Sequence, residues 1–434
     1  MFASKTAPAL MWARLKTFRK LFVPYPDYFY YMRVLQIHNF YKQAGGEDTV
    51  FEQEAQLLQA NGHTVEQLTF TNNNVKSIKD KLQAALGVIY NIQSADIIRN
   101  RILTFKPDVV HVHNFFPLVS PAVFEVCHKY KVPVVMTLHN YRLICPSAVL
   151  YYDGKVQLEN LQQVFPVKAI LKGVYRGSKI ETASVVLATG VHKLLGTWRN
   201  KVNKFIALTP GAADLFLQSS LNLKPEQLSI KPNFTADPGV GAAVRENYFL
   251  YLGRLTEEKG IRTLLKAHAA KPFPLRIIGT GPLQELVQEY AANNPSVEYL
   301  GYRQREEAME QLKKARALIF PSEWMETFGM TAVEAFATGT SVIAAKIGGG
   351  AHIVQHQQNG LHYTPGNAQE LLKQVDMLQK LPDLALSLGL HARKCYEQFY
   401  TPEANCKMLL QVYEQAIGAK QKPASATMAA EAGL

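Results

Sequence analysis

Glu326 and Glu334 stand eight positions apart, with a glycine and the expected start of a helix between them. The first amides of a helix lack intrahelical partners, and the helix dipole favours negative charge at that end. Phosphate oxygens or sugar hydroxyls near residues 327–330 would satisfy those amides. Either glutamate alone would be interpreted as a solvated surface acid. Together, shortly after the strand-ending Pro321, they predict a site that holds an anion beside sugar hydroxyls.

Two cations in the same half of the chain fit such a ligand. Arg254 and Lys259 lie five positions apart in a segment that is bounded by glycines and follows an expected strand. Arginine supplies a planar fork of donors and lysine a compact charge, and both suit a diphosphate. The two side chains could converge on one anion, and a solvated loop explains the same residues. Gly45 and Gly46, which precede a helix, are a weak signal for an anion cradle.

Three histidines in the first half could also do chemistry. His139 follows an expected strand, and open α/β sheets build their sites at the carboxyl ends of strands. A histidine there could orient or deprotonate the hydroxyl group of an acceptor, and a packing role explains it equally well. His111 and His113 share one face of another strand. No third metal ligand is apparent, so packed strand histidines are favoured over a metal site.

The composition is that of a globular protein with an excess of positive charge. The chain has 434 residues, enough for two or three domains, and a net charge of +12. That charge suits a nucleotide phosphate, a lipid-phosphate surface or a nucleic acid, but no basic–aromatic module typical of nucleic-acid binding is present. The four cysteines form no Cys-x-x-Cys pair, which favours a reduced cytoplasmic setting over a zinc or redox site.

The first 31 residues are basic, and no apolar run in the chain approaches the roughly 18 residues of a membrane span. Met11, Leu15, Phe18 and Phe22 recur at helical spacing within this extension. An amphipathic helix on an anionic membrane and an organelle transit peptide both fit the pattern. A natural start at Met32, which precedes the first strand, is the third interpretation.

Strands and helices alternate along the rest of the chain, which predicts two doubly wound α/β domains. The expected strands are short, apolar and rich in β-branched residues, as buried parallel strands are: 34–38, a strand near 65, 108–113, 132–137, 204–208, 249–252, 275–278, 317–320 and 341–344. A proline- and glycine-rich linker at 232–241 separates the domains. The predicted organisation is a basic extension (1–31), an acceptor-side domain (32–232), a donor domain (233–400), a last helix (401–418) and a disordered tail (419–434).

In order and spacing, these motifs resemble the retaining glycosyltransferases of family 4. The likeness covers residues 32–417 and rests on six short motifs: Gly-Gly at 45–46, His-Val-His-Asn at 111–114, Thr-Leu-His-Asn at 137–140, Gly-Arg-Leu-x-x-x-Lys-Gly at 253–260, Ile-Gly-x-Gly-Pro at 278–282 and Glu-x7-Glu at 326–334. Each motif is common alone, and their combination is specific. The resemblance implies the GT-B architecture, in which two Rossmann-like domains face a central cleft.

The resemblance also implies roles for individual residues. Arg254 and Lys259 would neutralise the departing diphosphate, Glu326 would touch the donor sugar, and Glu334 would bind the ribose. His139 would lie near the reaction centre, and Gly46 would let its loop approach the phosphates. The remaining residues that the resemblance assigns to donor binding are Gly45, Thr327, Phe328, Gly329 and Met330. The last helix would cross back onto the first domain, so that the hinge can close the cleft.

The expected activity is retaining transfer of a sugar from a nucleotide-sugar donor to a glycan or lipid-linked acceptor, at the cytoplasmic face of a membrane. No cofactor or metal is expected, because family members usually work without one and the chain has no Asp-x-Asp. Residues 348–352 depart from the family pattern, with His352 in place of an acid. A nucleotide-sugar epimerase and a non-catalytic sugar- or nucleotide-binding protein are the alternatives.

Overall fold

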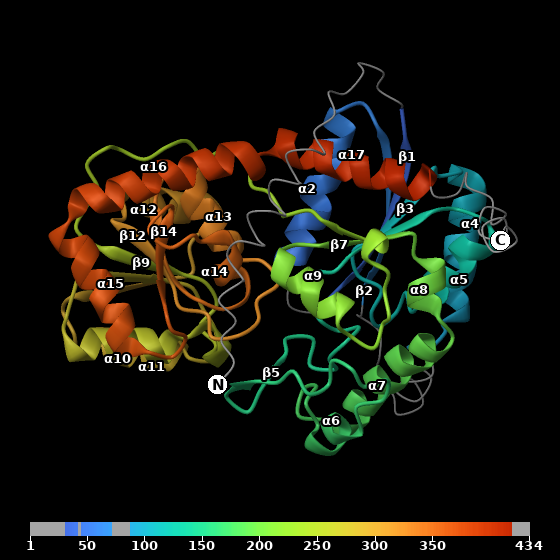
Figure 1. The fold of residues 1–434 in the computed structure, drawn as a ribbon, viewed down its shortest axis with the longest axis horizontal. Coiled ribbons are helices and arrows are strands. Elements are labelled where there is room, and N and C mark those ends of the chain that lie inside the picture. Colours follow the sequence, from blue (N-terminus) through green and yellow to red (C-terminus); the bar gives the residue numbers. More distant parts are fainter. Residues whose placement is uncertain (1–30, 42–44, 72–86, 419–434) are drawn as a thin grey trace, which may run out of the picture. The chain divides into compact units, whose positions relative to one another are not determined.

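The computed structural model describes residues 31–41, 45–71 and 87–418. Residues 33–434 form one compact unit, and residues 1–32 form another of which only Tyr31 and Met32 are described. The expectations for a helix within residues 1–31 and for a disordered tail from 419 therefore concern residues outside the described part. Two six-stranded sheets, each with helices packed against it, make up the larger unit (Figure 1).

The first sheet has the order β2-β1-β3-β4-β7-β8, with every neighbouring pair parallel. Its strands are β1 (Arg33–Phe40), β2 (Thr64–Thr71), β3 (Val109–Val112), β4 (Val134–Thr137), β7 (Lys204–Ala207) and β8 (Leu228–Ile230). Every residue of β3 and β4 is buried, which explains why these strands are short apolar runs without alternation. The helices of this half are α2 (Gly46–Ala60), α4 (Ile92–Phe105), α5 (Ala122–Lys129) and α9 (Pro210–Leu217), with a 3-10 turn η1 (Pro225–Gln227).

The second sheet has the order β11-β10-β9-β12-β13-β14, also parallel throughout. Its strands are β9 (Phe249–Leu252), β10 (Leu275–Ile278), β11 (Val297–Gly301), β12 (Ala317–Phe320), β13 (Ser341–Ala345) and β14 (Gly360–Tyr363). Its helices are α10 (Ile261–Ala270), α11 (Gln284–Ala292), α12 (Arg305–Lys314), α13 (Met330–Ala337), α14 (Gly348–Ile353), α15 (Ala368–Lys380) and α16 (Pro382–Phe399), with a 3-10 turn η2 (Glu257–Lys259).

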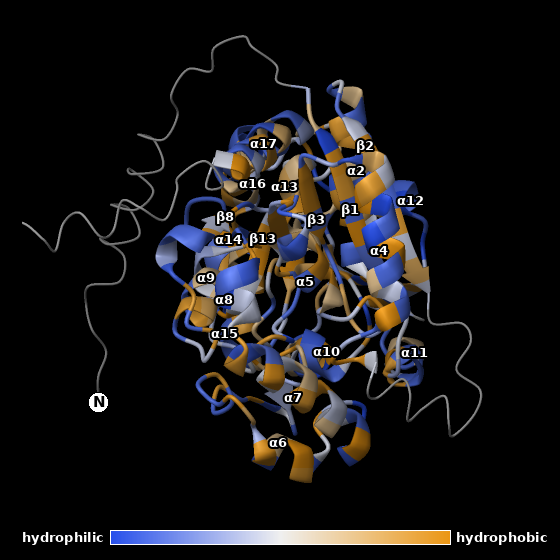
Figure 2. Ribbon diagram, turned by 90° about the vertical axis from the view of Figure 1, so that its right-hand side faces the viewer, coloured by the Kyte–Doolittle hydropathy of each residue, from blue (hydrophilic) through white to orange (hydrophobic). Residues whose placement is uncertain are grey.

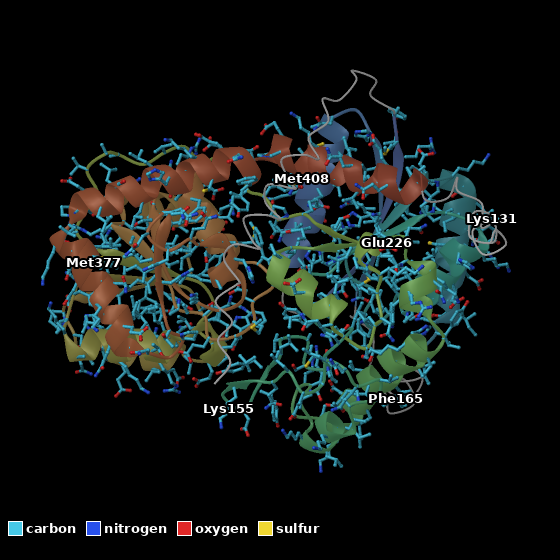
Figure 3. All side chains as sticks on the ribbon, in the orientation of Figure 1. Lys131, Lys155, Phe165, Glu226, Met377 and Met408 are labelled. Atoms are coloured by element: carbon cyan, nitrogen blue, oxygen red, sulfur yellow. The ribbon has the colours of Figure 1, made fainter. Side chains whose placement is uncertain are left out.

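A long insertion separates β4 from β7. It contains the two-stranded antiparallel ribbon β5 (Tyr151–Tyr152) and β6 (Lys155–Val156), followed by α6 (Val167–Lys172), α7 (Lys179–Leu194) and α8 (Thr197–Lys201). Lys155 and Phe165 mark the insertion in Figure 3. Figure 2 shows α6 and α7 side by side, with hydrophobic residues on both. The two helices also pack against each other.

The last helix, α17 (Pro402–Gly418), packs on α2, β3, β4 and β7 of the first half (Figure 1). Its Asn405 accepts a hydrogen bond from the buried Lys231 at 3.0 Å and donates one to the carbonyl of Pro232 at 2.6 Å. The helix therefore holds the start of the segment that joins the two sheets.

The expected fold class is confirmed: both halves are Rossmann-like and doubly wound. Each expected strand is present with ends within two residues of the predicted ones, and β5, β6, β8, β11 and β14 are additional. Among the described residues, the model contains no helix that is both long enough and apolar enough to cross a membrane.

A candidate donor and acceptor cleft between the two sheets

A cavity of about 840 Å³ opens between the two sheets. In each sheet the strand order reverses beside the first strand, between β1 and β3 and between β9 and β12. Crevices at the carboxyl ends of strands near such a reversal are the usual binding sites of open α/β sheets. The loops that follow β1, β4, β9 and β12 supply most of the lining.

The structure brings together all but one of the predicted site residues. Ten of them line the cavity: Gly45, Gly46, His139, Arg254, Lys259, Glu326, Thr327, Phe328, Gly329 and Met330. Glu334 is not part of this lining. The residues thus come from both halves, and the roles assigned to them remain predictions.

Lys259 and Glu326 form an ion pair at the centre of the donor side. Lys259 Nζ donates to Glu326 Oε1 at 2.7 Å, and Ser322 Oγ donates to Glu326 Oε2 at 3.0 Å. Lys259 Nζ also lies 5.5 Å from the ring centre of Trp324, within range of a cation–π contact. Arg254 is more open, with 65% of its side chain exposed and a 3.8 Å ion pair to Glu258. An anion entering the cavity can therefore reach Arg254 freely, but must share Lys259 with Glu326.

Gly329 precedes α13 and helps place the amides that were predicted to face a ligand. It has φ +145°, a conformation that L side chains rarely adopt. Beneath the loop, Gly349 donates from its amide to the Glu326 carbonyl at 2.7 Å. A Cβ at Gly349 would lie 1.2 Å from the Phe328 carbonyl oxygen. The glycines of 348–350, where the chain departs from the family pattern, thus let α14 support the loop between Glu326 and Phe328.

The Glu326 and Glu334 carboxylates have different partners. Glu334 accepts a hydrogen bond from Arg305 of α12. Burial raises the pKa of Glu334, while Arg305 lowers it. The geometry places this carboxylate against α12 rather than in the cavity, because residue 334 projects from the fifth position of α13. For Glu334 to bind a ribose as predicted, Arg305 would have to share the Glu334 carboxylate with the ribose hydroxyls.

Thr327 joins the two halves across the cleft. Its hydroxyl donates to the His139 carbonyl at 2.8 Å, and its own carbonyl accepts from the Thr209 hydroxyl at 3.2 Å. These two hydrogen bonds hold the loop after β12 against His139 and Thr209 of the first half.

His139 lines the cavity with a half-buried side chain. Burial lowers its pKa to about 3, with the Lys231 ammonium and His38 acting in the same direction and the Glu54 carboxylate opposing them. The ring is therefore neutral at physiological pH. Its Nε2 lies 3.1 Å from His113 Nδ1, so this nitrogen is turned inward rather than toward a ligand.

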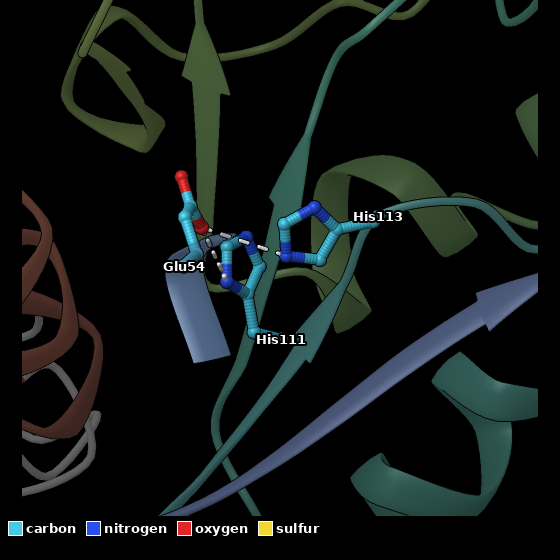
Figure 4. A group of neighbouring side chains, drawn as sticks. All are labelled: Glu54, His111 and His113. Carbon is cyan, nitrogen blue, oxygen red and sulfur yellow. Dashed lines mark ion pairs between the residues drawn. The ribbon is translucent and has the colours of Figure 1, made fainter. Parts of the chain in front are cut away.

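His113 belongs to a buried cluster with Glu54 and His111, drawn in Figure 4. Glu54 Oε2 lies 3.5 Å from His113 Nε2 and 3.7 Å from His111 Nδ1. The three groups lie within 4.8 Å of one another, as metal ligands could. The sequence offered no third ligand for the two histidines, and Glu54 fills that place. The cluster lies outside the cavity lining.

Contacts already made by the cluster favour packing over a metal. Lys231, fully buried, donates to Glu54 Oε1 at 2.7 Å. His111 bonds through both nitrogens, to the Tyr413 hydroxyl and to Thr137 Oγ1, each at 2.8 Å. A cation would have to displace those bonds and lie beside the lysine charge. The donor set therefore does not suit a metal, in agreement with the interpretation of packed strand histidines.

Comparisons with known proteins agree with this arrangement. Residues 44–177 match the model described as Glycosyltransferase Family 4, and residues 235–395 match the one described as Glycosyl transferases group 1. Together the two matches span more than half of the chain. The chain belongs to glycosyltransferase family 4.

Relatives of this family 4 glycosyltransferase extend over much of its length. A glycosyltransferase of Methanocaldococcus jannaschii is 24% identical over 85% of this chain and 94% of that protein. Another from the same organism is 27% identical over 62% of this chain, and a protein in the cps region of Klebsiella pneumoniae is 27% identical over 60% of it. The matched region spans slightly under two thirds of these last two proteins, 66% and 63%.

Solved structures share the fold of the family 4 chain. Sucrose-phosphate synthase from Thermosynechococcus elongatus superposes with a TM-score of 0.66 at 19% identity, covering 89% of this chain and all of that one. Anabaena HepE, in complex with UDP, superposes with a TM-score of 0.62 at 16% identity, covering 88% and 99%. These likenesses confirm the expected GT-B architecture.

Glu47 and Arg142 are two of the cavity residues that the sequence of the family 4 chain did not predict. Glu47, at the start of α2, contacts Asn114 and Asn140 at 3.4 Å each. Burial, with the neighbouring Asp48 charge, raises its pKa to about 7. The feature of the sequence that could have predicted Glu47 is its position directly after the Gly45–Gly46 pair, in a helix that begins at the cavity.

Arg142 is the second. It is buried against aromatic rings, with its guanidinium carbon 4.5 Å from the ring centre of Phe116 and 4.8 Å from that of Tyr175. Arg142 and Tyr175 both line the cavity, and both belong to the first half. The aromatic rings around Arg142 come from distant segments, so no local pattern marks this residue, although it lies three positions after His139.

Proposed function

We propose that this protein transfers a sugar from a nucleotide-sugar donor to a hydroxyl acceptor, with retention of anomeric configuration and without a metal. The observation that supports it is the meeting of two sets of groups in one cavity. Lys259, Arg254 and the start of α13 offer positive potential for a diphosphate, and His139 faces them from the other half. Charge on the departing diphosphate would be stabilised by these groups.

The acceptor is proposed to be a glycan or a lipid-linked glycan. HepE has been solved with UDP and with UDP-glucose, and Staphylococcus aureus TarM with UDP and alpha-GlcNAc-glycerol. O-antigen chain mannosyltransferase C of Escherichia coli is 25% identical over 41% of this chain. Sugar transfer in cell-surface glycan synthesis is the proposal that these relatives support.

Nucleotide-sugar binding and turnover test the proposal together. Thermal shifts against UDP-, GDP- and ADP-sugars should single out one base and sugar, since a ligand that binds only the folded state raises Tm. The selected donor should release its nucleotide only with an acceptor, activity should persist in EDTA, and the anomeric coupling of the product should match the donor. An epimer formed from donor alone, or saturable binding without turnover, would point to the two alternatives.

We also propose that the enzyme touches an anionic membrane through the outward face of α7. Ile180, Leu187 and Leu194 recur every seven residues there and are 79%, 48% and 70% exposed. The half-exposed residues between them on this face, Ala183, Ser184 and Val191, carry no charge. A solvated helix normally presents charge on such a face. Lys172, Arg176 and Lys179 precede the face; Lys172 pairs with Glu159 and Arg176 with Glu181, and anionic headgroups would take the place of these acids.

Vesicle co-sedimentation of the full chain tests this contact. Leu187→Glu should lower binding to phosphatidylglycerol vesicles severalfold, while Leu390→Glu on α16, which removes a leucine of similar exposure, should not. Binding lost only on Phe18→Glu would assign the contact to the N-terminal extension instead. Equal binding to phosphatidylcholine vesicles would contradict the charge argument.

A further inference from the structure

The buried cluster reaches the cavity through a row of three side chains. Glu54 Oε2 faces His113 Nε2 at 3.5 Å, and His113 Nδ1 faces His139 Nε2 at 3.1 Å. Glu54 Oε2 and His113 Nε2 are both buried, and neither makes a hydrogen bond of ordinary geometry in the described part of the chain; the 3.5 Å that separates them is an ion-pair distance. Figure 4 shows the first pair, with a dashed line that joins the Glu54 carboxylate to the His113 ring.

We infer that Glu54 and His113 are positioning residues that fix the tautomer of His139, so that its Nδ1 is presented to the cavity as a hydrogen-bond acceptor. The inference deepens the proposed function and rests on it only for the use to which that nitrogen is put. A hydroxyl of the donor sugar or of the acceptor is the group that would donate to it.

The charge of Glu54, at the buried end of the row, decides which nitrogen of each histidine carries the proton. Burial alone would raise the pKa of Glu54, but Lys231 and His111 outweigh it and hold that pKa below its usual value. The group is therefore a carboxylate at neutral pH and can only accept, so the proton of His113 lies on Nε2. His113 Nδ1 then has a lone pair, and His139 Nε2–H must donate to it. In a neutral imidazole this leaves Nδ1 of His139 unprotonated.

His111 also lies near this carboxylate oxygen, with its Nδ1 3.7 Å from Glu54 Oε2, but that nitrogen already contacts the Tyr413 hydroxyl at 2.8 Å. His113 stays neutral because burial, His139, His38 and Lys231 together hold its pKa well below the usual value. His139 is neutral for similar reasons. Within the described residues, His139 makes its polar contacts through Nε2 and its carbonyl, at 3.1 Å and 2.8 Å. Nδ1 of this cavity-lining residue is thus the nitrogen left for a ligand.

In Glu54→Gln, donors and acceptors along the row should change places while the side chains keep their positions. Lys231 Nζ donates to the Oε1 position at 2.7 Å and requires an oxygen there, so the amide nitrogen takes the Oε2 position and faces His113. His113 Nε2 must then accept, its Nδ1 carries the proton, and His139 Nε2 becomes an acceptor. The variant therefore presents an N–H instead of a lone pair to the cavity.

The tautomers are read directly by long-range 1H–15N correlation spectra of the full chain labelled with [15N]histidine. The chain has twelve histidines, and His139→Asn identifies the resonances of His139. The wild type should show His139 protonated on Nε2, and Glu54→Gln should show it protonated on Nδ1. Tyr413→Phe is the matched control: it removes a hydroxyl from the same cluster but not from the row, so the His139 tautomer should not change.

Turnover gives the second readout. Glu54→Gln should lower kcat about 10- to 100-fold. This is the loss expected when the Nδ1–H of His139 faces a ligand hydroxyl that also donates. The Tyr413→Phe control should keep kcat within about twofold, since a lost neutral hydrogen bond outside the row affects stability rather than the presented nitrogen.

Two results would overturn the inference: wild-type His139 protonated on Nδ1, or a Glu54→Gln variant whose His139 tautomer is that of the wild type. The wild-type spectrum decides even if the variant does not fold. If the wild type turns over no nucleotide sugar, the proposed function fails, but the spectra still test the row.

Discussion

The two halves of the molecule hold their cavity charges differently. On the donor side Lys259 and Glu326 pair in a loop region, with 16% and 14% of their side chains exposed, and Arg254 stands in solvent. On the acceptor side the charges lie beneath the surface: Lys231 and Glu54 are buried below two neutral histidines. The first arrangement can exchange partners when an anion arrives. In the second arrangement, an exchange of partners would leave a buried charge unpaired, which is strongly destabilising.

The difference suggests a division of labour between the halves. In the proposed reaction, the half that carries Lys259 would bind a highly charged group and release it in every cycle, which suits ion pairs that can be shared with a ligand. The half that carries His139 would present one nitrogen in one protonation state, which suits a buried network with no freedom. Four changes would break or sharpen this comparison, in order of decreasing effect.

Lys259→Ala should have the largest effect. It removes the cation nearest Glu326 and leaves that carboxylate facing the proposed diphosphate, so kcat/KM should fall about 100- to 1,000-fold. Steady-state kinetics with the donor found by thermal shift measures it. Arg262→Ala is the control, because it removes an exposed cation three residues away that does not line the cavity. Near-native turnover in Lys259→Ala would refute the donor-side assignment.

Gly349→Ala should weaken donor binding by about tenfold or more. The new methyl group would lie 1.2 Å from the Phe328 carbonyl oxygen, so the loop between Glu326 and Phe328 must move. Calorimetric titration of the donor nucleotide gives the change in Kd. Gly46→Ala is the acceptor-side counterpart, since a Cβ there meets nothing within 4 Å. A loss in Gly46→Ala as large as that in Gly349→Ala would show that phosphate approaches Gly46 closely, as the family resemblance implies.

Glu47→Gln should change the pH dependence of stability. The pKa of Glu47 is raised to about 7 in the folded protein, so between its unfolded value and pH 7 the folded state holds the extra proton. The stability that this proton contributes is lost as pH rises through that window. The Tm of Glu47→Gln relative to wild type should therefore rise by a few degrees from about pH 4.5 to 7 and then level off. Parallel Tm curves for the two proteins would contradict the raised pKa.

Thr327→Val should have the smallest effect. It removes the hydroxyl that donates to the His139 carbonyl across the cleft, a neutral bond of about 0.5–1.5 kcal/mol. Because this bond joins the two halves rather than a ligand, KM for the donor should rise about two- to fivefold with kcat little changed. Thr331→Val, in the next turn and also at the cavity, is the comparison variant. Equal effects would indicate that Thr327 acts on the ligand instead.

Local patterns were sufficient to predict the fold. The β-branched runs of β3, β4, β9 and β12 marked buried strands, and Gly253 after β9 marked a loop that lines the cavity. Lys259, Glu326 and His139 were predictable for the same reason: each lies in the segment after a strand end, seven residues after β9, six after β12 and two after β4. Their position depends on the chain near them rather than on distant contacts.

What sequence could not supply was the choice of partner. The spacing of Glu326 and Glu334 suggested that the two carboxylates act together, but Arg305, 29 positions earlier, binds Glu334. Glu54 meets His113 from a helix 59 positions earlier, and no spacing rule connects them. Long-range packing decides such pairs.

The contact of α17 with the first half has a consequence for how the enzyme is made. Asn405 meets Lys231 across 174 residues of chain, and Tyr413 meets His111 across 302. Domains fold in the order in which synthesis delivers them, so the first sheet emerges well before its last helix. Until the ribosome reaches α17, Lys231 and His111 have Glu54 and Thr137 of the first half as partners but lack Asn405 and Tyr413. A chain cut short before Asn405 would therefore possess every residue of the cavity and still lack the support of its acceptor side.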